Sequence, residues 1–121
     1  MAARRFFRSF KFAWSGIKTA LAGEQNIKIH LLISLVVLGT AYVLDFSVVR
    51  FAILFIVIGV VISLEIVNTA LERVVDLVTE EFHPLAKQAK DMAAGAVLVF
   101  SLIAVIIGLL LFVKPVLHYL F

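Results

Sequence analysis

Apolar residues fill most of the chain, and their spacing divides it into one amphipathic stretch and three long apolar stretches. Within residues 3–22, apolar side chains recur every three or four positions, as Phe6, Phe10, Trp14 and Ile17 show, and cations fall largely between them. This spacing is typical of a basic amphipathic helix whose aromatic side chains anchor it in a membrane surface. We therefore expect an N-terminal surface helix at residues 3–22.

The three apolar stretches predict helices that cross a membrane. We expect them at residues 27–44, 48–79 and 85–113, where the second extends beyond the membrane at its C-terminal end and the third begins before it. Residues 45–47 form a turn so short that the first two spans must be antiparallel neighbours. Pro84 is suited to open the last helix, and Lys114 with Pro115 to close it. The predicted fold is an all-α membrane protein with a single domain, 1–121.

A stripe of polar residues interrupts the end of the second apolar stretch. Glu65, Asn68, Glu72 and Asp76 follow fourteen residues without a charge and are separated by three, four and four positions. At about 100° per residue they share one helix face, at roughly 0°, −60°, −20° and +20°. Acidic residues at membrane depth are costly and usually face a partner, a cavity or an ion. The stripe is the first candidate for a functional site. A simply solvated helix face is the alternative, and it suits Asp76 best.

The composition indicates an integral membrane protein. Of the 121 residues, 64% are hydrophobic, which is more apolar surface than a water-soluble domain of this length could bury. The chain has no cysteine, which excludes disulfides and thiolate metal sites. The formal net charge is +3, and six basic residues precede residue 30 against one acid, Glu24. A membrane surface with anionic lipids explains this basic arm better than nucleic acid, which we do not expect as a partner.

The distribution of cations orients the spans. The N-terminal arm and the loop at residues 79–91 carry most of the lysines and arginines, whereas the opposite side has Arg50 and Lys114. Because segments rich in Lys and Arg stay in the cytoplasm, we expect the N-terminus and the acidic stripe at the cytoplasmic face of the membrane. Three spans then place the C-terminus outside.

The polar side chains at this cytoplasmic end suit a divalent cation and phosphate. Mg²⁺ prefers a few carboxylates together with phosphate oxygens and water, and lysine offsets the charge on a transferring phosphoryl group. Glu65 is the deepest carboxylate and therefore the best candidate for a general base that acts on a lipid hydroxyl. The chain contains no GxxxxGK[ST], HRD or DFG sequence. If it binds a nucleotide, it therefore does so without the motifs of the soluble kinases.

Two long sequence blocks carry a family resemblance. EIVNTALERVVD at residues 65–76 resembles the E-x-x-N-[ST]-A-x-E-x-x-x-D signature of the prokaryotic diacylglycerol kinase / undecaprenol kinase family. HPLAKQAKD at 83–91, followed by AAGAV at 93–97, is similar to the second block of that family, and FAWSG at 12–16 and EQN at 24–26 are similar to its N-terminal region. The resemblance implies a small homotrimeric kinase of the bacterial inner membrane, with one surface helix and three spans per protomer. Such enzymes move the γ-phosphoryl of MgATP to a lipid hydroxyl at sites shared between protomers.

The same resemblance implies roles for individual residues. Glu65 would be the base that takes the proton from the lipid hydroxyl, and Asn68 would help to position the reacting groups. Glu24 and Glu72 would hold Mg²⁺. The nucleotide contacts would come from Asp76, Glu81, His83, Lys90 (on phosphate) and Asp91, and from Arg5 and Phe12 on the surface helix.

The amino-acid sequence of the second block favours one lipid acceptor. It is similar to the members from Gram-positive bacteria, which favour undecaprenol. The Gram-negative diacylglycerol kinases tend to have Glu where this chain has His30 and Pro84, and Arg where it has Gln88. The resemblance therefore implies an undecaprenol kinase that makes undecaprenyl phosphate, with diacylglycerol as the alternative acceptor.

A non-enzymatic membrane protein is the alternative from another class. The acidic stripe could serve as an ion-binding path or belong to a regulatory subunit. An ion path needs polar residues through the whole bilayer, however, and the spans offer few outside the stripe. The outer halves of the three spans have none beyond Ser34, Thr40, Ser63 and Ser101.

Overall fold

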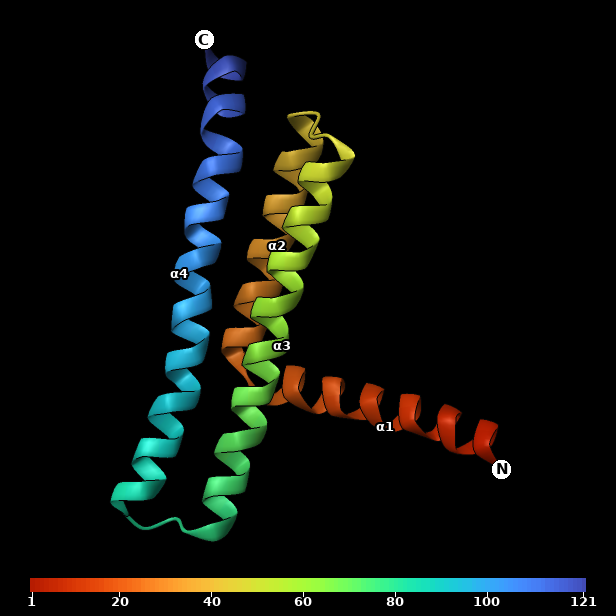
Figure 1. The fold of residues 1–121 in the computed structure, drawn as a ribbon, viewed down its shortest axis with the longest axis vertical. Coiled ribbons are helices and arrows are strands. Elements are labelled where there is room, and N and C mark those ends of the chain that lie inside the picture. Colours follow the sequence, from red (N-terminus) through yellow and green to blue (C-terminus); the bar gives the residue numbers. More distant parts are fainter.

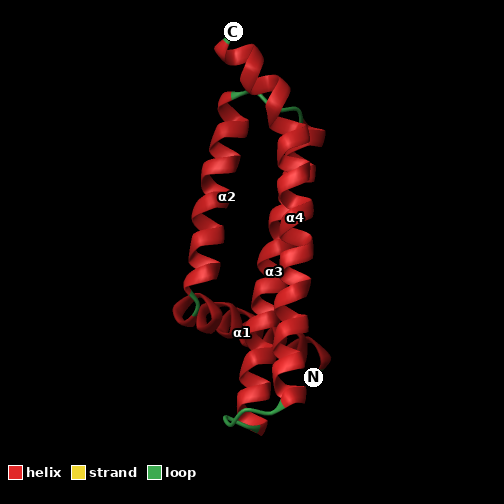
Figure 2. Ribbon diagram, turned by 90° about the vertical axis from the view of Figure 1, so that its left-hand side faces the viewer, coloured by secondary structure: helices red, strands yellow, loops and turns green.

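The computed structural model describes all residues, 1–121, and contains four helices and no strand (Figures 1 and 2). The helices are α1 (Ala2–Gly23), α2 (Gln25–Val43), α3 (Val48–Val78) and α4 (Pro84–Leu120). The expected all-helical fold is therefore confirmed. The last three helices are long and apolar enough to cross a membrane, as the sequence predicts.

α3 is the central helix and packs against both α2 and α4. These three helices run along one another, whereas α1 leaves the bundle at a steep angle and carries the N-terminus away from it (Figure 1). The α2–α3 turn and the α3–α4 loop lie at opposite ends of the bundle (Figure 1). We call the first the hairpin end, with residues 41–54 and 111–112. We call the second the acidic end, with residues 65–91 and the start of α2 at residues 24–30, which contacts them through His30 and Glu65.

The hairpin end holds the main apolar core. Asp45 turns the chain with φ 60°, a left-handed conformation that Asp tolerates better than most residues. Ser47 then caps α3, because its hydroxyl accepts a hydrogen bond from the backbone N–H of Arg50 at 3.3 Å. Between these helices Ala41, Phe46 and Leu54 are buried together.

α4 does not end at Val113 as the sequence predicts, but continues through Pro115 to Leu120. Proline has no N–H, so the carbonyl of Leu111, four residues earlier, loses its helical donor. The guanidinium of Arg50 replaces that donor, because its Nη1 lies 3.2 Å from the Leu111 oxygen. A tertiary hydrogen bond from α3 therefore compensates for the break, which explains why the helix passes the proline.

At the acidic end, a short loop from Thr79 to His83 joins α3 to α4. The side chain of His83 caps α4, with its Nδ1 accepting from the N–H of Leu85 at 3.1 Å. Pro84 follows at the first helical position, where its missing N–H costs nothing. At the other junction Glu24 alone links α1 to α2, in an extended conformation.

Few residues of the single chain are shielded. Only 8 of the 121 residues are buried, and long apolar side chains of α2, α3 and α4 stay exposed. Exposed apolar surface of this extent requires lipid or other protein around it. The buried set nevertheless includes two polar residues, Glu65 and Thr69, and both lie at the start of the acidic end.

Candidate active site

The polar stripe of α3 runs from the interior of the bundle out to the loop. Glu65 is 7% exposed, Asn68 and Glu72 are partly buried, and Asp76 is exposed. The side-chain oxygen of Asn68 is buried and has no hydrogen-bond partner. Buried polar atoms in folded proteins are nearly always paired, so the position beside Asn68 is suited to a group that the chain does not itself provide.

Glu65 meets a side chain from α2. The Nε2 atom of His30 lies 3.2 Å from Oε1 of Glu65. Thr69, one turn further along α3, donates its hydroxyl to the backbone carbonyl of Glu65 at 3.0 Å and not to the carboxylate. The deepest acid of the stripe is therefore contacted across a helix–helix interface, which the spacing on α3 alone does not predict.

Lys90 joins the stripe to the second sequence block. Its Nζ donates to Oδ1 of Asp76 at 2.6 Å, which links α4 to α3 before the apolar part of α4 begins. This hydrogen bond, together with the negative charges of Asp76 and Glu72, raises the pKa of Lys90 above its ordinary value. The cation is therefore held in its charged form beside two carboxylates, where a phosphate could compete for it. Asp91, its neighbour, pairs with Lys87 one turn away.

The loop residues are held mainly through their backbone. The hydroxyl of Thr79 donates to the Glu81 carbonyl at 3.3 Å and accepts from the Glu81 N–H at 3.2 Å. The Glu81 carboxylate is free of ion pairs. Because Nδ1 of His83 is used as the helix cap, only its Nε2 remains for a ligand.

Of the two α1 residues predicted to contact the nucleotide, one lies near the stripe helix and the other does not. Phe12 borders a groove between α1 and α3, together with Thr69, Ala70 and Arg73. Arg5 lies in the first turns of α1, at the end that points away from the bundle (Figure 1). A single chain therefore brings Phe12 close to the stripe helix and does not bring Arg5 there.

A profile of the prokaryotic diacylglycerol kinase family matches residues 11–112, which is most of the chain. The chain belongs to the prokaryotic diacylglycerol kinase family. The matched range includes Glu24, the stripe and the second block, and leaves Arg5 outside. Members of this family are ATP-dependent lipid kinases, and this chain is therefore an ATP-dependent phosphotransferase.

Curated relatives of this kinase family agree along nearly the whole chain. The undecaprenol kinase of Bacillus subtilis is 47% identical over 108 residues, which cover 89% of this chain and 88% of that protein. The diacylglycerol kinase of Synechocystis is 44% identical over 90% of this chain and 63% of that protein. The diacylglycerol kinase of Escherichia coli K12 is 31% identical over 84% of each chain. The non-enzymatic alternative gains no support from these relatives.

The carboxylates of this kinase fit a Mg²⁺ ion that is shared with phosphate. No group of three or more His, Cys, Asp or Glu side chains gathers in the chain, so an all-protein metal cage is absent. Mg²⁺ in kinases is commonly held by one or two carboxylates together with substrate phosphates and water. Neither Glu24 nor Glu72 is engaged in an ion pair, and the unpaired Asn68 oxygen lies on the same stripe.

Two features of the acidic end are not evident from the sequence. The first is the His30 contact to Glu65. The second is Arg73, whose Nη2 would lie 2.8 Å from a Cβ atom placed on Gly23, so its guanidinium is seated against the end of α1. In the sequence, the one sign of a cation near the stripe is that Arg73 lies between Glu72 and Asp76.

Proposed function

We propose that the protein is a membrane lipid kinase that transfers the γ-phosphoryl of MgATP to the hydroxyl of undecaprenol. The observation that carries the proposal is Glu65, a carboxylate that is 7% exposed where the apolar part of α3 ends, in a chain of this kinase family. The 47% identical relative named undecaprenol kinase supports the acceptor. Diacylglycerol is the second candidate, because the other relatives carry that name.

Glu65 is the proposed general base. A buried carboxylate next to the acceptor can take the hydroxyl proton as the oxygen attacks, provided that it lies within hydrogen-bond reach. The lipid oxygen then bonds to the γ-phosphorus while the bond to the β–γ bridging oxygen breaks, and ADP leaves with that electron pair. Asn68 is proposed to position the reacting groups, because its buried side-chain oxygen has no hydrogen-bond partner within the chain.

The remaining site residues are proposed to hold the nucleotide. Glu24 and Glu72 would hold Mg²⁺, which neutralises charge on the phosphate oxygens when it is bound. Lys90 would contact phosphate, because its charge is already secured beside Asp76. The other nucleotide contacts are proposed at Arg5, Phe12, Asp76, Glu81, His83 and Asp91.

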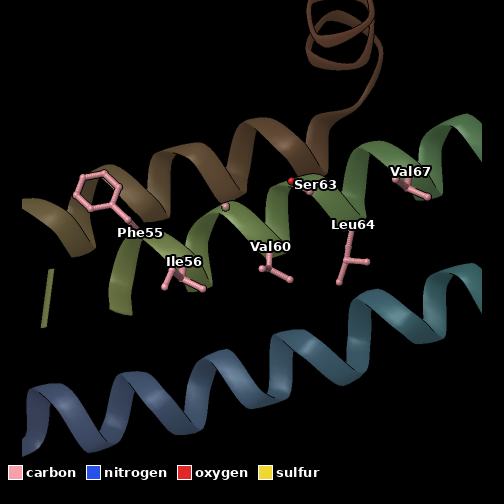
Figure 3. Close-up of a pocket in the computed structure, with 7 residues that line it drawn as sticks. Phe55, Ile56, Val60, Ser63, Leu64 and Val67 are labelled. Atoms are coloured by element: carbon pink, nitrogen blue, oxygen red, sulfur yellow. The ribbon is translucent and has the colours of Figure 1, made fainter. Parts of the chain in front are cut away.

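A homotrimer is part of this proposal. One side of α3 is an open apolar groove of about 420 Å³, bordered by Phe55, Gly59, Ser63, Leu64 and Val67 among others (Figure 3). Glycine and serine on such a face allow a neighbouring helix to approach closely. A second copy packed there would also bring its own α1 and loop near the stripe. An active species with the mass of one chain in detergent would contradict this assembly.

The proposed orientation places α1 along the cytoplasmic surface and the acidic end on the side where ATP is found. The chain has no cysteine, so single cysteines can be introduced without background. A cysteine at Ser47 should react with a membrane-impermeant thiol reagent in intact spheroplasts, and one at Glu80 should react only after the membrane is opened. The opposite pattern would invert the topology.

The decisive experiment gives the purified protein Mg²⁺ and γ-labelled ATP in mixed micelles that contain either undecaprenol or diacylglycerol. We expect strong label in the polyprenol. Label in diacylglycerol alone would retain the mechanism and change the acceptor. No label in either lipid, from protein that still assembles, would contradict the kinase proposal and favour a non-enzymatic membrane protein.

A further inference from the structure

The contact between His30 and Glu65 gives the proposed base a partner from a second helix. The side chain of Glu65 is 9% exposed and that of His30 is 29% exposed, and the two meet at 3.2 Å. The other two ion pairs of the chain involve exposed or half-exposed side chains at the loop. This contact alone lies inside the bundle.

The neighbours of Glu65 on its own helix do not hold its carboxylate. The Thr69 hydroxyl is committed to the Glu65 backbone carbonyl. Asn68 has a buried acceptor oxygen without a partner, and its amide nitrogen, which could donate, forms no hydrogen bond with the Glu65 carboxylate in the structure. With a proton on Nε2, His30 is therefore the side chain placed to fix Oε1 of Glu65.

The surroundings of His30 leave its ring one polar partner. Its backbone carbonyl accepts a hydrogen bond from the Ser34 hydroxyl at 2.6 Å. Its ring borders a mostly apolar cavity of about 330 Å³ between α2, α3 and α4, which residues such as Val61 and Ala104 line. Ser34 and Ser101 also line the cavity, but neither hydroxyl forms a hydrogen bond with the imidazole, so Glu65 is the polar group that Nε2 meets.

We propose that His30 is a positioning residue for phosphoryl transfer, which fixes one carboxylate oxygen of Glu65 so that the other can take the proton of the acceptor hydroxyl. The inference rests on the proposed function. A glutamate has three side-chain torsions, and a general base works only within hydrogen-bond reach of its proton. A partner that locks the carboxylate rotamer therefore raises the fraction of productive encounters without touching the nucleotide.

Three variants test this role in assembled protein supplied with MgATP and the lipid acceptor. His30→Leu removes the donor and should lower kcat by about 10- to 100-fold, the scale found for partners that orient a working group, with an unchanged KM for MgATP. His30→Gln places an amide nitrogen close to the position of Nε2 and should restore most of the rate. Ser101→Ala, which removes a hydroxyl from the same cavity, is the matched control and should stay near the wild type.

A double substitution separates positioning from general packing. When Glu65→Gln has already removed the base, His30→Leu should cause no further loss of the residual rate, because residues that act as a unit are not additive. A structural role would reduce that rate again. If the leucine variant does not assemble, His30→Asn replaces it, since its shorter amide cannot reach Glu65.

The outcomes are distinguishable. A wild-type kcat in His30→Leu, an additive loss in the double variant, or a rise in the KM for MgATP alone would each overturn the role of His30 and leave the kinase proposal intact. Normal transfer by Glu65→Gln would remove the base and with it this inference. Absence of transfer by the wild type to either lipid would overturn the proposed function and the inference together.

Discussion

The two ends of the helix bundle satisfy their polar groups in opposite ways. At the hairpin end, the carbonyl freed by Pro115 receives a hydrogen bond from Arg50, and the guanidinium also lies 5.4 Å from the ring centre of Phe46. At the acidic end, Asn68 keeps a buried oxygen without any partner, and Glu24 and Glu72 have no ion pair.

The difference indicates which end is satisfied within one chain and which end has polar groups left for a partner. A buried polar atom without a hydrogen bond costs about 1–3 kcal/mol, and the hairpin end avoids this cost with residues of its own chain. The acidic end retains it. Such a cost is tolerated where a substrate, an ion or a neighbouring protomer supplies the missing partner, which is the arrangement expected of a shared phosphotransfer site.

The largest predicted effect follows from neutralising the proposed base. Glu65→Gln keeps the shape of the side chain and removes its ability to take a proton, so turnover should fall by about 10²- to 10⁴-fold. The mass of the assembled protein and its affinity for a non-hydrolysable ATP analogue should not change. The matched control is Glu80→Gln, an exposed acid in the loop. Equal rates in the two variants would remove Glu65 from the chemistry.

A smaller and more specific effect is expected at Glu72. Glu72→Gln should raise the Mg²⁺ concentration for half-maximal rate by at least about tenfold, since even indirect partners of a metal site contribute that much. Excess Mg²⁺ should recover much of the rate. Titrations of rate against Mg²⁺ at saturating ATP measure the shift, and a curve that superimposes on that of the wild type would contradict the ligand role.

The hairpin end should respond in stability and not in turnover. Arg50→Met leaves the Leu111 carbonyl without its donor, and the loss of a hydrogen bond from a charged group should lower the free energy of unfolding by about 1.5–3 kcal/mol. Lys114→Met is the control, a cation at the same end without an ion pair. Denaturant unfolding in detergent measures the difference. A loss of kcat in folded Arg50→Met would contradict the prediction that the hairpin end affects stability alone.

The smallest effect concerns pH at the acidic end. The hydrogen bond to Asp76 raises the pKa of Lys90, so the folded state holds that proton more tightly than the unfolded chain does. The resulting stabilisation is complete below the ordinary lysine value of 10.5 and is lost as the pH rises through the higher folded value. Wild-type protein should therefore lose slightly more stability than Lys90→Gln over this alkaline range. Parallel curves would show that the pair contributes nothing.

The sequence predicts the helices well because each depends on local periodicity. The stripe from Glu65 to Asp76 is visible from spacing alone, and its graded burial in the structure follows the predicted depth. The predicted end of α4 was wrong, because the hydrogen-bond donor that replaces the missing N–H of Pro115 belongs to Arg50, sixty-one residues from its acceptor in the sequence. The His30 contact was missed for the same reason, because it depends on how α2 packs against α3. The assigned roles of the site residues stay predictions.

The contrast between the ends can be measured in the two turns that close them. Hydrogen exchange of backbone amides is compared with and without Mg²⁺ and a non-hydrolysable ATP analogue, in the loop Thr79–His83 and in the turn Leu44–Ser47. We predict slower exchange in the loop at the acidic end and no change in the turn at the hairpin end. Protection of the hairpin turn, or of neither turn at saturating nucleotide, would contradict the assignment of phosphoryl transfer to the acidic end.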